Sequence, residues 1–449
     1  MRHHGRTLLT LALLLGLAAC AAPRPPVDVL ADREAGVSRR VAAVATAADG
    51  VDTRNALDRL VWDDSQPTTV RLAAVDRLVA LDEPGLRLRL TLRLAEVDNW
   101  DVLRRLCVLA AERGWTDATP ELAASWARES TLVADADRPE RAALRALHAD
   151  ATTEDVVWAV ATGVEERDTY AVRPRQRVAA WCLTMRLLPH DEVGRRLDEL
   201  DGEAGGAMVG VLRRAWRDFR ILPATPQRVA WVLHVAAAGV WPEARNEPGL
   251  QPRHLPVMVQ DVDAGAPRDE LLRQLQHDLA WRGAGRHPRH DEGATTAAPD
   301  ERLEAHADTL ARADLLHLLA ILDTLDRPVV KDALFAAADA DLLDTTSEHG
   351  GVLTFDGYTP FEPGRRGNDH RFDAPAAMMP AVYEGLAHVH FHAQRHDNAA
   401  YAGPGGGDRL FADRFGTACL VLTFVDADTL NVDYYHEGGV VIDLGTLRR

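Results

Sequence analysis

The stretch YEGLAHVHFHAQRHDNAAYAGPGGGD, residues 383–408, decides how the last part of the chain is expected to fold. It contains His388, His390 and His392, which alternate with Val389 and Phe391 at the end of an apolar run. Side chains two residues apart on a strand point to the same face, about 6.6 Å apart at the backbone. One strand therefore presents its imidazoles to one side, where two of them can bind the same metal ion.

Asp408 follows these histidines after a loop rich in Gly and Pro. Catalytic zinc sites commonly have three protein ligands and leave a fourth position for water. His390 and His392, or alternatively His388 and His390, would complete such a set with Asp408. Two other interpretations stay open: the histidines can be the polar face of a half-exposed strand, and Asp408 can be the N-cap of a helix that begins there.

The residues after Ser347 predict a domain of α+β structure. Short β-branched and aromatic runs bounded by Gly and Asp are typical of strands. The predicted strands are GGVLTFDG (350–357), AVYEGLAHVHFH (381–392), ACLVLTFVD (418–426), TLNVDYY (429–435) and GGVVIDLG (438–445). The last three, joined by short turns, are expected to form an antiparallel meander.

The order of three elements resembles the JAMM (MPN-type) metallopeptidases: Glu348 before a Gly-Gly strand, the His-x-His that ends at His392, and then Asp408. The resemblance covers about residues 345–445. It implies an α+β JAMM-like fold, zinc held by two histidines and Asp408, and Glu348 as the catalytic base in the hydrolysis of an amide bond. Glu384, on the run that leads to the histidines, is a weaker candidate for the base.

Three features depart from the pattern of that family. Gly405 stands where the family has a serine whose hydroxyl helps to stabilise the oxyanion. The separation between His392 and Asp408 is longer, with Ala393 where proline is usual, and the third histidine makes the register of the His-x-His ambiguous. The first expected function is therefore a zinc-dependent amide hydrolase of the peptidase or isopeptidase type. The alternative is a non-catalytic interaction scaffold with a degenerate or structural metal site.

The region from about residue 36 to residue 343 has helical periodicity, with apolar residues three and four apart and short breaks rich in Asp, Thr, Pro and Gly. Helix pairs that recur roughly every 35–45 residues resemble HEAT-like repeats, so an all-α solenoid is expected to precede the α+β domain. An irregular helical domain is the alternative. Such a solenoid implies a protein or peptide partner.

The N-terminal residues MRHHGRTLLTLALLLGLAAC have a basic start, an apolar run and then small residues, which is the pattern of a secretory signal. The last four, Leu17 to Cys20, resemble a bacterial lipobox, which implies lipidation of Cys20 and a lipid-anchored protein of the bacterial cell envelope. A plain signal peptide cut near Ala19 or Ala22 is the alternative. The net charge of −17 repels phosphate backbones, so nucleic acid is not an expected partner.

These patterns predict six segments. They are a signal peptide (1–20), a tether (21–35), the helical-repeat solenoid (36–281), a flexible linker (282–300), a helical connector (301–346) and the JAMM-like α+β domain (347–449).

Overall fold

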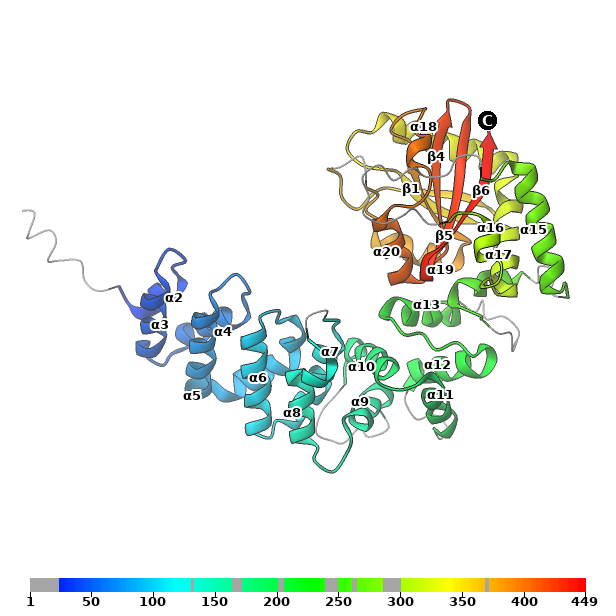
Figure 1. Cartoon of the computed structure of the whole chain (residues 1–449). Helices are drawn as coiled ribbons and strands as arrows, with labels where there is room; N and C mark the ends of the chain where they lie inside the picture. Colours follow the sequence, from blue (N-terminus) through cyan, green and yellow to red (C-terminus); the bar gives the residue numbers. More distant parts are fainter. Residues whose placement is uncertain are drawn as a thin grey trace, which may run out of the picture. The chain divides into compact units, whose positions relative to one another are not determined.

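The computed structural model describes residues 24–130, 133–163, 172–200, 206–238, 249–260, 265–285, 300–367 and 371–449. The expected signal peptide with Cys20, and most of the expected linker at 282–300, lie outside the described residues. The described part is mostly helical and ends in a mixed six-stranded sheet (Figure 1). Two compact units divide between Leu187 and Leu188.

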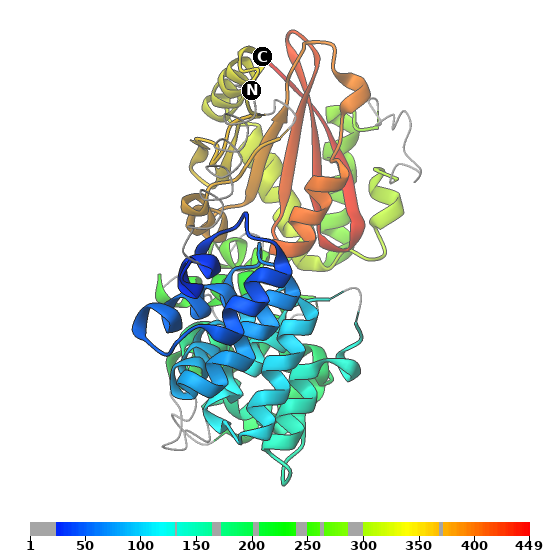
Figure 2. The same ribbon diagram turned by 90° about the vertical axis from the view of Figure 1, so that its left-hand side faces the viewer.

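The first unit consists of helices whose partners lie close by in the sequence. Helix α5 packs against α4 and α6, and α10 packs against α7 and α9. The helices are α2 (Pro26–Ala31), α3 (Val37–Thr46), α4 (Val51–Trp62), α5 (Thr68–Arg93), α6 (Trp100–Glu112), α7 (Thr119–Ala127), α8 (Pro139–Leu147), α9 (Thr153–Thr162) and α10 (Pro174–Leu187). Figure 2 shows these helices in blue to cyan colours. The solenoid with HEAT-like repeats stays a prediction.

Local sequence signals explain where several of these helices begin. The side chains of Asn99 and Thr152 accept backbone N–H bonds in the first turns of α6 and α9, which satisfies donors that a helix start leaves unpaired. Pro84 inside α5 coincides with a kink at Asp82, as expected because proline cannot continue the backbone ladder. Part of the expected tether is also helical: Pro26–Ala31 forms α2, and its Leu30 is buried.

The second unit contains the sheet together with a set of helices. Its helices are α11 (His190–Glu199), α12 (Gly206–Phe219), α13 (Pro226–Ala237), α14 (Leu255–Val259), α15 (Arg268–Arg282), α16 (Leu303–His306), α17 (Arg312–Leu325), α18 (Pro328–Leu343), α19 (Met379–Glu384) and α20 (Gly406–Phe415). The strands are β1 (Gly350–Thr354), β2 (Gly357–Phe361), β3 (Ala387–His392), β4 (Cys419–Asp426), β5 (Thr429–His436) and β6 (Val440–Arg448). Helices from residue 190 onward thus belong to the same unit as the sheet, which was expected to form a domain of its own from residue 347.

The sheet has the order β2-β1-β3-β4-β5-β6. Only β3 and β4 pair in parallel, and all other neighbours are antiparallel. The predicted meander of the last three strands is confirmed. Strand β2 was not predicted, and the run expected to be one strand from Ala381 divides into helix α19 and strand β3, because Gly385 separates an apolar helical turn from the alternating His-x-His segment.

Helices cover both faces of the sheet. Helix α20 packs with Ala412 and Phe411 against Cys419, Val421 and Tyr435. On the other face, Phe335 of α18 contacts Phe424 of β4, with ring centroids 6.4 Å apart. Alternation along β3 and β4 places the three histidines on the α20 face, since His388 pairs with Cys419 and His390 with Val421.

Polar contacts tie the helices of this unit to the strands and to the loops between them. The indole of Trp231 donates to the carbonyl of Tyr383 at 2.8 Å, and the guanidinium of Arg282 donates to the carbonyl of Leu444 at 3.0 Å. The ring of His317 bonds the carbonyl of Leu386 at 2.7 Å. Each contact supplies a hydrogen-bond donor to a buried carbonyl oxygen that water cannot reach.

A buried ion cluster centres on Asp314 of α17, which is 5% exposed. Its carboxylate accepts from Arg253 and from the ring of His254, both at 2.8 Å. Arg253 also donates to Glu437, directly after β5, at 2.9 Å. Burial would raise the pKa of Asp314, but His254, Arg253 and His436 together hold it below its ordinary value.

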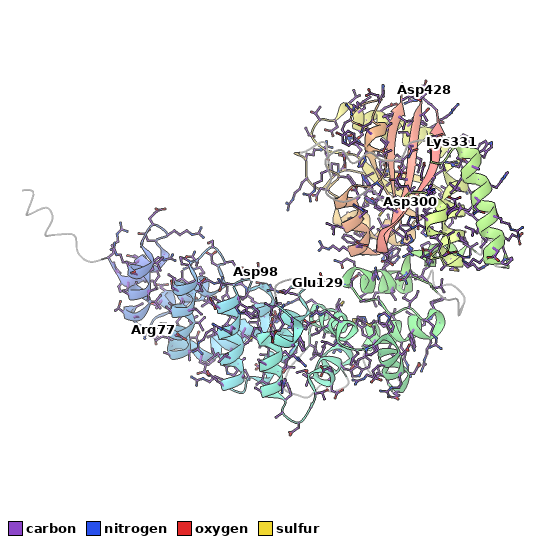
Figure 3. All side chains as sticks on the ribbon, viewed as in Figure 1. Arg77, Asp98, Glu129, Asp300, Lys331 and Asp428 are labelled. Carbon is purple, nitrogen blue, oxygen red and sulfur yellow. The ribbon has the colours of Figure 1, made fainter. Side chains whose placement is uncertain are left out.

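The exposed surface carries scattered charges. Lys331, the only lysine of the sequence, lies on α18 with its Nζ 3.7 Å from Asp326 (Figure 3). Within the described residues, which begin at Arg24, no helix is both long enough and apolar enough to cross a membrane.

Replacement of Asp314 by Asn is expected to destabilise the second unit by about 3–5 kcal/mol, because buried Arg253 would lose one of its two carboxylate partners and His254 would lose its charged acceptor. Urea unfolding of the full chain, followed by hydrogen exchange of peptides from β4 and β5, measures this. Because the pKa of Asp314 is depressed, the stabilisation is present at neutral pH and is lost as the pH falls below about 4.

The matched control is Asp323→Asn on the same helix. Asp323 is exposed and pairs with Arg327 one turn away, so its loss should change the free energy of unfolding by less than about 0.5 kcal/mol. Equal effects of the two substitutions would contradict the assigned role of the buried cluster.

Candidate metal centre

Strand β3 places the three histidines on one face at different depths. His388 and His390 are buried, whereas His392, at the end of the strand, keeps 14% of its side chain exposed. The hydrogen-bond ladder with β1 on one side and β4 on the other fixes the strand. The imidazoles therefore belong to a rigid element rather than to a loop, which favours a preorganised site.

The connection between β3 and β4 brings Asp408 to these histidines. Parallel neighbours need a crossover, and here the crossover carries α20, which begins at Gly406. Asp408 lies in its first turn, with Oδ1 3.4 Å from His390 Nε2 and Oδ2 3.8 Å from His392 Nε2. The helix begins before Asp408, whose carboxylate accepts the N–H of Gly405 at 2.6 Å and so caps the helix from its third position.

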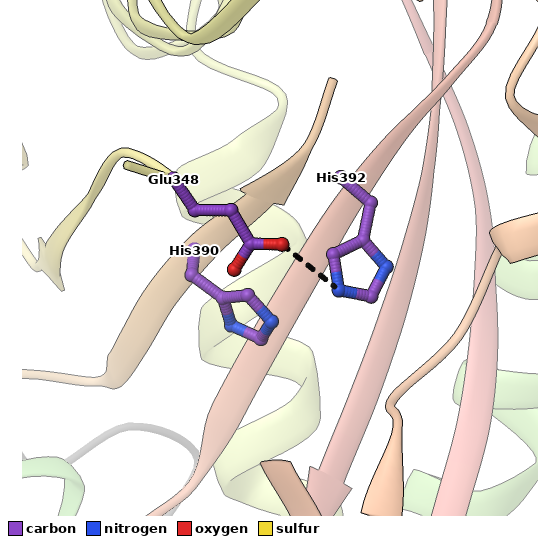
Figure 4. Close-up of side chains that lie close together, drawn as sticks. All are labelled: Glu348, His390 and His392. Carbon is purple, nitrogen blue, oxygen red and sulfur yellow. Dashed lines mark ion pairs between the residues drawn. The ribbon is translucent and has the colours of Figure 1, made fainter. Parts of the chain in front are cut away.

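Glu348 reaches the same point from β1. In the antiparallel register Gly350 pairs with His390, and the same register continued by two residues places Glu348 opposite His392. Its Oε1 lies 3.9 Å from His392 Nε2 (Figure 4). One donor atom from each of Glu348, His390 and His392 lies within 4.8 Å of the other two, and this is the only such group among the described residues.

The imidazole nitrogens at this point are suited to hold a metal ion. The Nδ1 of His392 lies 3.0 Å from the carbonyl oxygen of Tyr401; since a carbonyl only accepts, Nδ1 carries the proton and the lone pair of Nε2 faces the site. Nδ1 of buried His390 has no hydrogen-bond partner within the described part of the chain, and its Nε2 has the carboxylate of Asp408 3.4 Å away. The two side chains thus face each other, as two ligands of one metal ion would.

The donor atoms are close enough to hold one metal ion. Asp408 Oδ1 lies 3.4 Å from His390 Nε2, Asp408 Oδ2 lies 3.8 Å from His392 Nε2, and Glu348 Oε1 lies 3.9 Å from His392 Nε2. Ligands at about 2.0–2.1 Å around a tetrahedral ion lie about 3.3 Å from one another. Imidazole with carboxylate is also a ligand set that zinc accepts.

Burial and the neighbouring charged groups shift the pKa values of Glu348 and Asp408 in opposite directions. Burial raises the pKa of Glu348 to about 7, with the charge of Asp408 raising it further and His390 and Gln394 opposing the rise. Burial disfavours the charged form of Asp408 too, but His390 and His392 bring its pKa well below the ordinary value. Asp408 is therefore an anion at neutral pH, whereas Glu348 has a pKa suited to accepting and releasing a proton.

The other candidate residues lie apart from this group. His388 packs between Phe372 and Phe411, with ring centroids 5.7 and 4.7 Å away, and burial lowers its pKa to about 3. Of the two histidine pairs left open by the sequence, the geometry brings His390 and His392 together with Asp408. Glu384 lies on α19, where its carboxylate bonds His234 instead.

Three polar residues that the sequence did not single out support the site. Gln394 donates to Glu348 Oε1 at 3.2 Å, and Asn398 donates to the carbonyl of His392 at 3.0 Å. Asp341, on α18, accepts the N–H groups of His349 and Ala393, and burial raises its pKa to about 8. Gln394 and Asn398 follow the histidines closely in sequence, but nothing in the helical stretch around Asp341 marks that residue.

A comparison of the chain with protein-family models, with curated proteins and with solved structures gives no match. The geometry and chemistry of the site therefore carry the functional assignment.

The purified full chain is expected to retain about one equivalent of zinc after exhaustive dialysis, measured by elemental analysis. Replacement of both His390 and His392 by Ala should remove more than about nine-tenths of it, because two of the nitrogen ligands are lost. The control is His396→Ala, four residues after His392 and exposed on the loop after β3. Zinc that stays bound in the double variant would place the metal elsewhere.

Proposed function

We propose that this protein is a zinc-dependent hydrolase of amide bonds, with a JAMM-like catalytic domain that acts on peptides or isopeptides. One observation carries the proposal: a carboxylate with a raised pKa, Glu348, lies beside two histidines whose Nε2 atoms face Asp408 at 3.4 and 3.8 Å. A purely structural zinc site needs no such carboxylate, because its ligands close the coordination shell.

In this proposal, His390, His392 and Asp408 hold the metal. When bound, zinc would polarise the scissile carbonyl and acidify a water molecule. The Nδ1–H of His392 donates to the carbonyl of Tyr401 and so keeps the ring oriented. The N–H of Gly405 does the same for Asp408.

Glu348 acts as general base in this mechanism. Its carboxylate takes a proton from the water that attacks the carbonyl carbon and then delivers it to the departing amine nitrogen, so that it is regenerated after each turnover. Gln394 donates to Oε1 at 3.2 Å and orients the group. Burial raises the pKa of Glu348 to about 7, and the charge of a zinc ion nearby would lower it and favour the carboxylate that accepts the proton.

Stabilisation of the oxyanion is the weak point of the site. Gly405 has no hydroxyl to donate, and its N–H is used by Asp408. The amino end of α20 carries a partial positive charge, and Asp408 lies in its first turn. Loss of one oxyanion donor costs about 10²–10³ in rate, so turnover is expected to be slow.

The rest of the chain supplies location and partner in the proposal. The lipobox-like end of the N-terminal segment would place a lipid on Cys20 and anchor the protein to a membrane of a bacterial envelope. The helices of the first unit would bind the protein or peptide partner, in the manner of a HEAT-like solenoid.

Replacement of Glu348 by Gln is expected to lower the rate of hydrolysis about 10²–10⁴-fold while zinc stays bound. The rate is measured on a panel of quenched-fluorescence peptides and isopeptides, with zinc content determined on the same samples. The control is Glu384→Gln, which alters an exposed carboxylate on α19 and should leave the rate unchanged. A wild type that binds zinc and hydrolyses none of the panel would favour the scaffold with a structural metal.

Replacement of Cys20 by Ser is expected to move the protein from the membrane fraction to the soluble fraction of the envelope, because the thiol that would carry the lipid is lost. Fractionation of cells that express the full chain measures this, together with the mass of the mature N-terminal peptide. A wild-type peptide that begins after Ala22 without added lipid mass would contradict the anchor.

A further inference from the structure

The buried carboxylate of Asp341 does not belong to the candidate metal centre, but it accepts backbone hydrogen bonds from the residues that follow Glu348 and His392. Asp341 lies in the last turn of α18 and is 2% exposed. Its Oδ1 accepts the N–H of His349 at 2.5 Å, and its Oδ2 accepts the N–H of Ala393 at 3.1 Å. His349 directly follows Glu348, and Ala393 directly follows His392. A single side chain thus joins the two segments that carry the base and a metal ligand.

These two bonds lie where the ladder between β1 and β3 ends. The last paired residues are Gly350 and His390, and beyond them the N–H of Phe391 still donates to the carbonyl of His349 at 3.2 Å. The N–H of His349, in contrast, donates to Asp341. Glu348 and His392 therefore lie outside the ladder, and the carboxylate of Asp341 sets how far their backbones stand apart.

Burial of Asp341 costs free energy, so a position without a function would be unfavourable. The carboxylate is buried and pairs with no cationic side chain of the described residues, and burial of a carboxylate without a cation is unfavourable. Glu348 and His390 are both close enough to interact with it electrostatically.

The same contact accounts for Ala393. Proline at this position, which the JAMM pattern would have, carries no N–H. Here alanine supplies the N–H that reaches Asp341. A proline at position 393 could not form this hydrogen bond with Asp341.

We propose that Asp341 is a positioning residue of the metal centre, which holds the segment of the metal ligand His392 against the segment of Glu348 through the N–H groups of Ala393 and His349 and so raises the affinity for zinc. This inference rests on the proposed metal site. Asp341 touches neither the metal position nor the substrate, and acts only through the backbone that it holds.

The test measures the zinc dissociation constant of the full chain by competition with a chromophoric chelator. Asp341→Asn keeps the size of the side chain but replaces one acceptor oxygen by an N–H₂ donor. Affinity should fall about 10–100-fold, as for other groups that orient metal ligands. The control is Asp339→Asn on the same helix, which alters a half-exposed carboxylate paired with Arg449 and should change the affinity less than about twofold.

Two further measurements separate positioning from general stability. In the cobalt-substituted protein, the visible absorption bands should change in Asp341→Asn and not in Asp339→Asn. With His392 already replaced by Ala, Asp341→Asn should weaken binding by less than it does in the wild type, because positioning of that ligand no longer matters. Equal effects in both backgrounds would overturn the inference.

A second variant covers the case in which Asp341→Asn does not fold. Ala393→Pro removes one of the two N–H donors and leaves the carboxylate in place, and it should also weaken zinc binding. Unchanged affinity in a folded Asp341→Asn or Ala393→Pro protein would overturn the inference alone. Absence of zinc from the wild type would overturn the proposed function as well.

Discussion

The pairing of β1 with β3 is the interaction on which the candidate site depends. It fixes the register that places Glu348 across from His392, and it holds both segments on one rigid sheet. The parallel pairing of β3 with β4 adds the second constraint, since it requires a crossover and so brings the first turn of α20 over the histidines. Four side chains, from β3, the first turn of α20 and the segment directly before β1, meet because of these two pairings.

The helices of the second unit hold this sheet from its other face. Asp314 with Arg253 and His254 joins α17 to the segment before α14, and Glu437 extends the cluster to the end of β5. Such a buried ion cluster adds less to stability than its Coulomb energy suggests, but removal of one member is costly. Asp341 of α18 shows how the same helical layer reaches the site, because it accepts backbone N–H groups on both segments that flank the cluster.

Local alternation predicted the strands of the meander. The resemblance to the JAMM pattern implied that Glu348, two of the histidines and Asp408 come together. It left the choice of histidine pair open, since periodicity places His388, His390 and His392 on one face equally; Phe372 and Phe411, which pack around His388, come from distant segments. The edge strand β2 was missed because GYTPF contains a proline and little apolar alternation.

The position of Asp341 could not be inferred from the sequence either. The run of alanines and aspartates around it predicts only a helix, and its two partners are backbone groups, which have no signature in sequence. The same holds for the carbonyl of Tyr401, whose contact with His392 selects the tautomer. Contacts with distant backbone groups depend on the tertiary fold. They orient the side chains that could bind a metal ion.

The most direct test of the central claim is X-ray absorption at the zinc edge of the metal-loaded full chain. The account predicts a tetrahedral shell of nitrogen and oxygen atoms at about 2.0–2.1 Å, with the multiple scattering typical of two imidazoles. That pattern should be lost when His390 and His392 are replaced by Ala. A shell with sulfur at about 2.3 Å, or one of oxygen atoms without imidazole, would contradict the assignment of His390, His392 and Asp408 as the metal ligands.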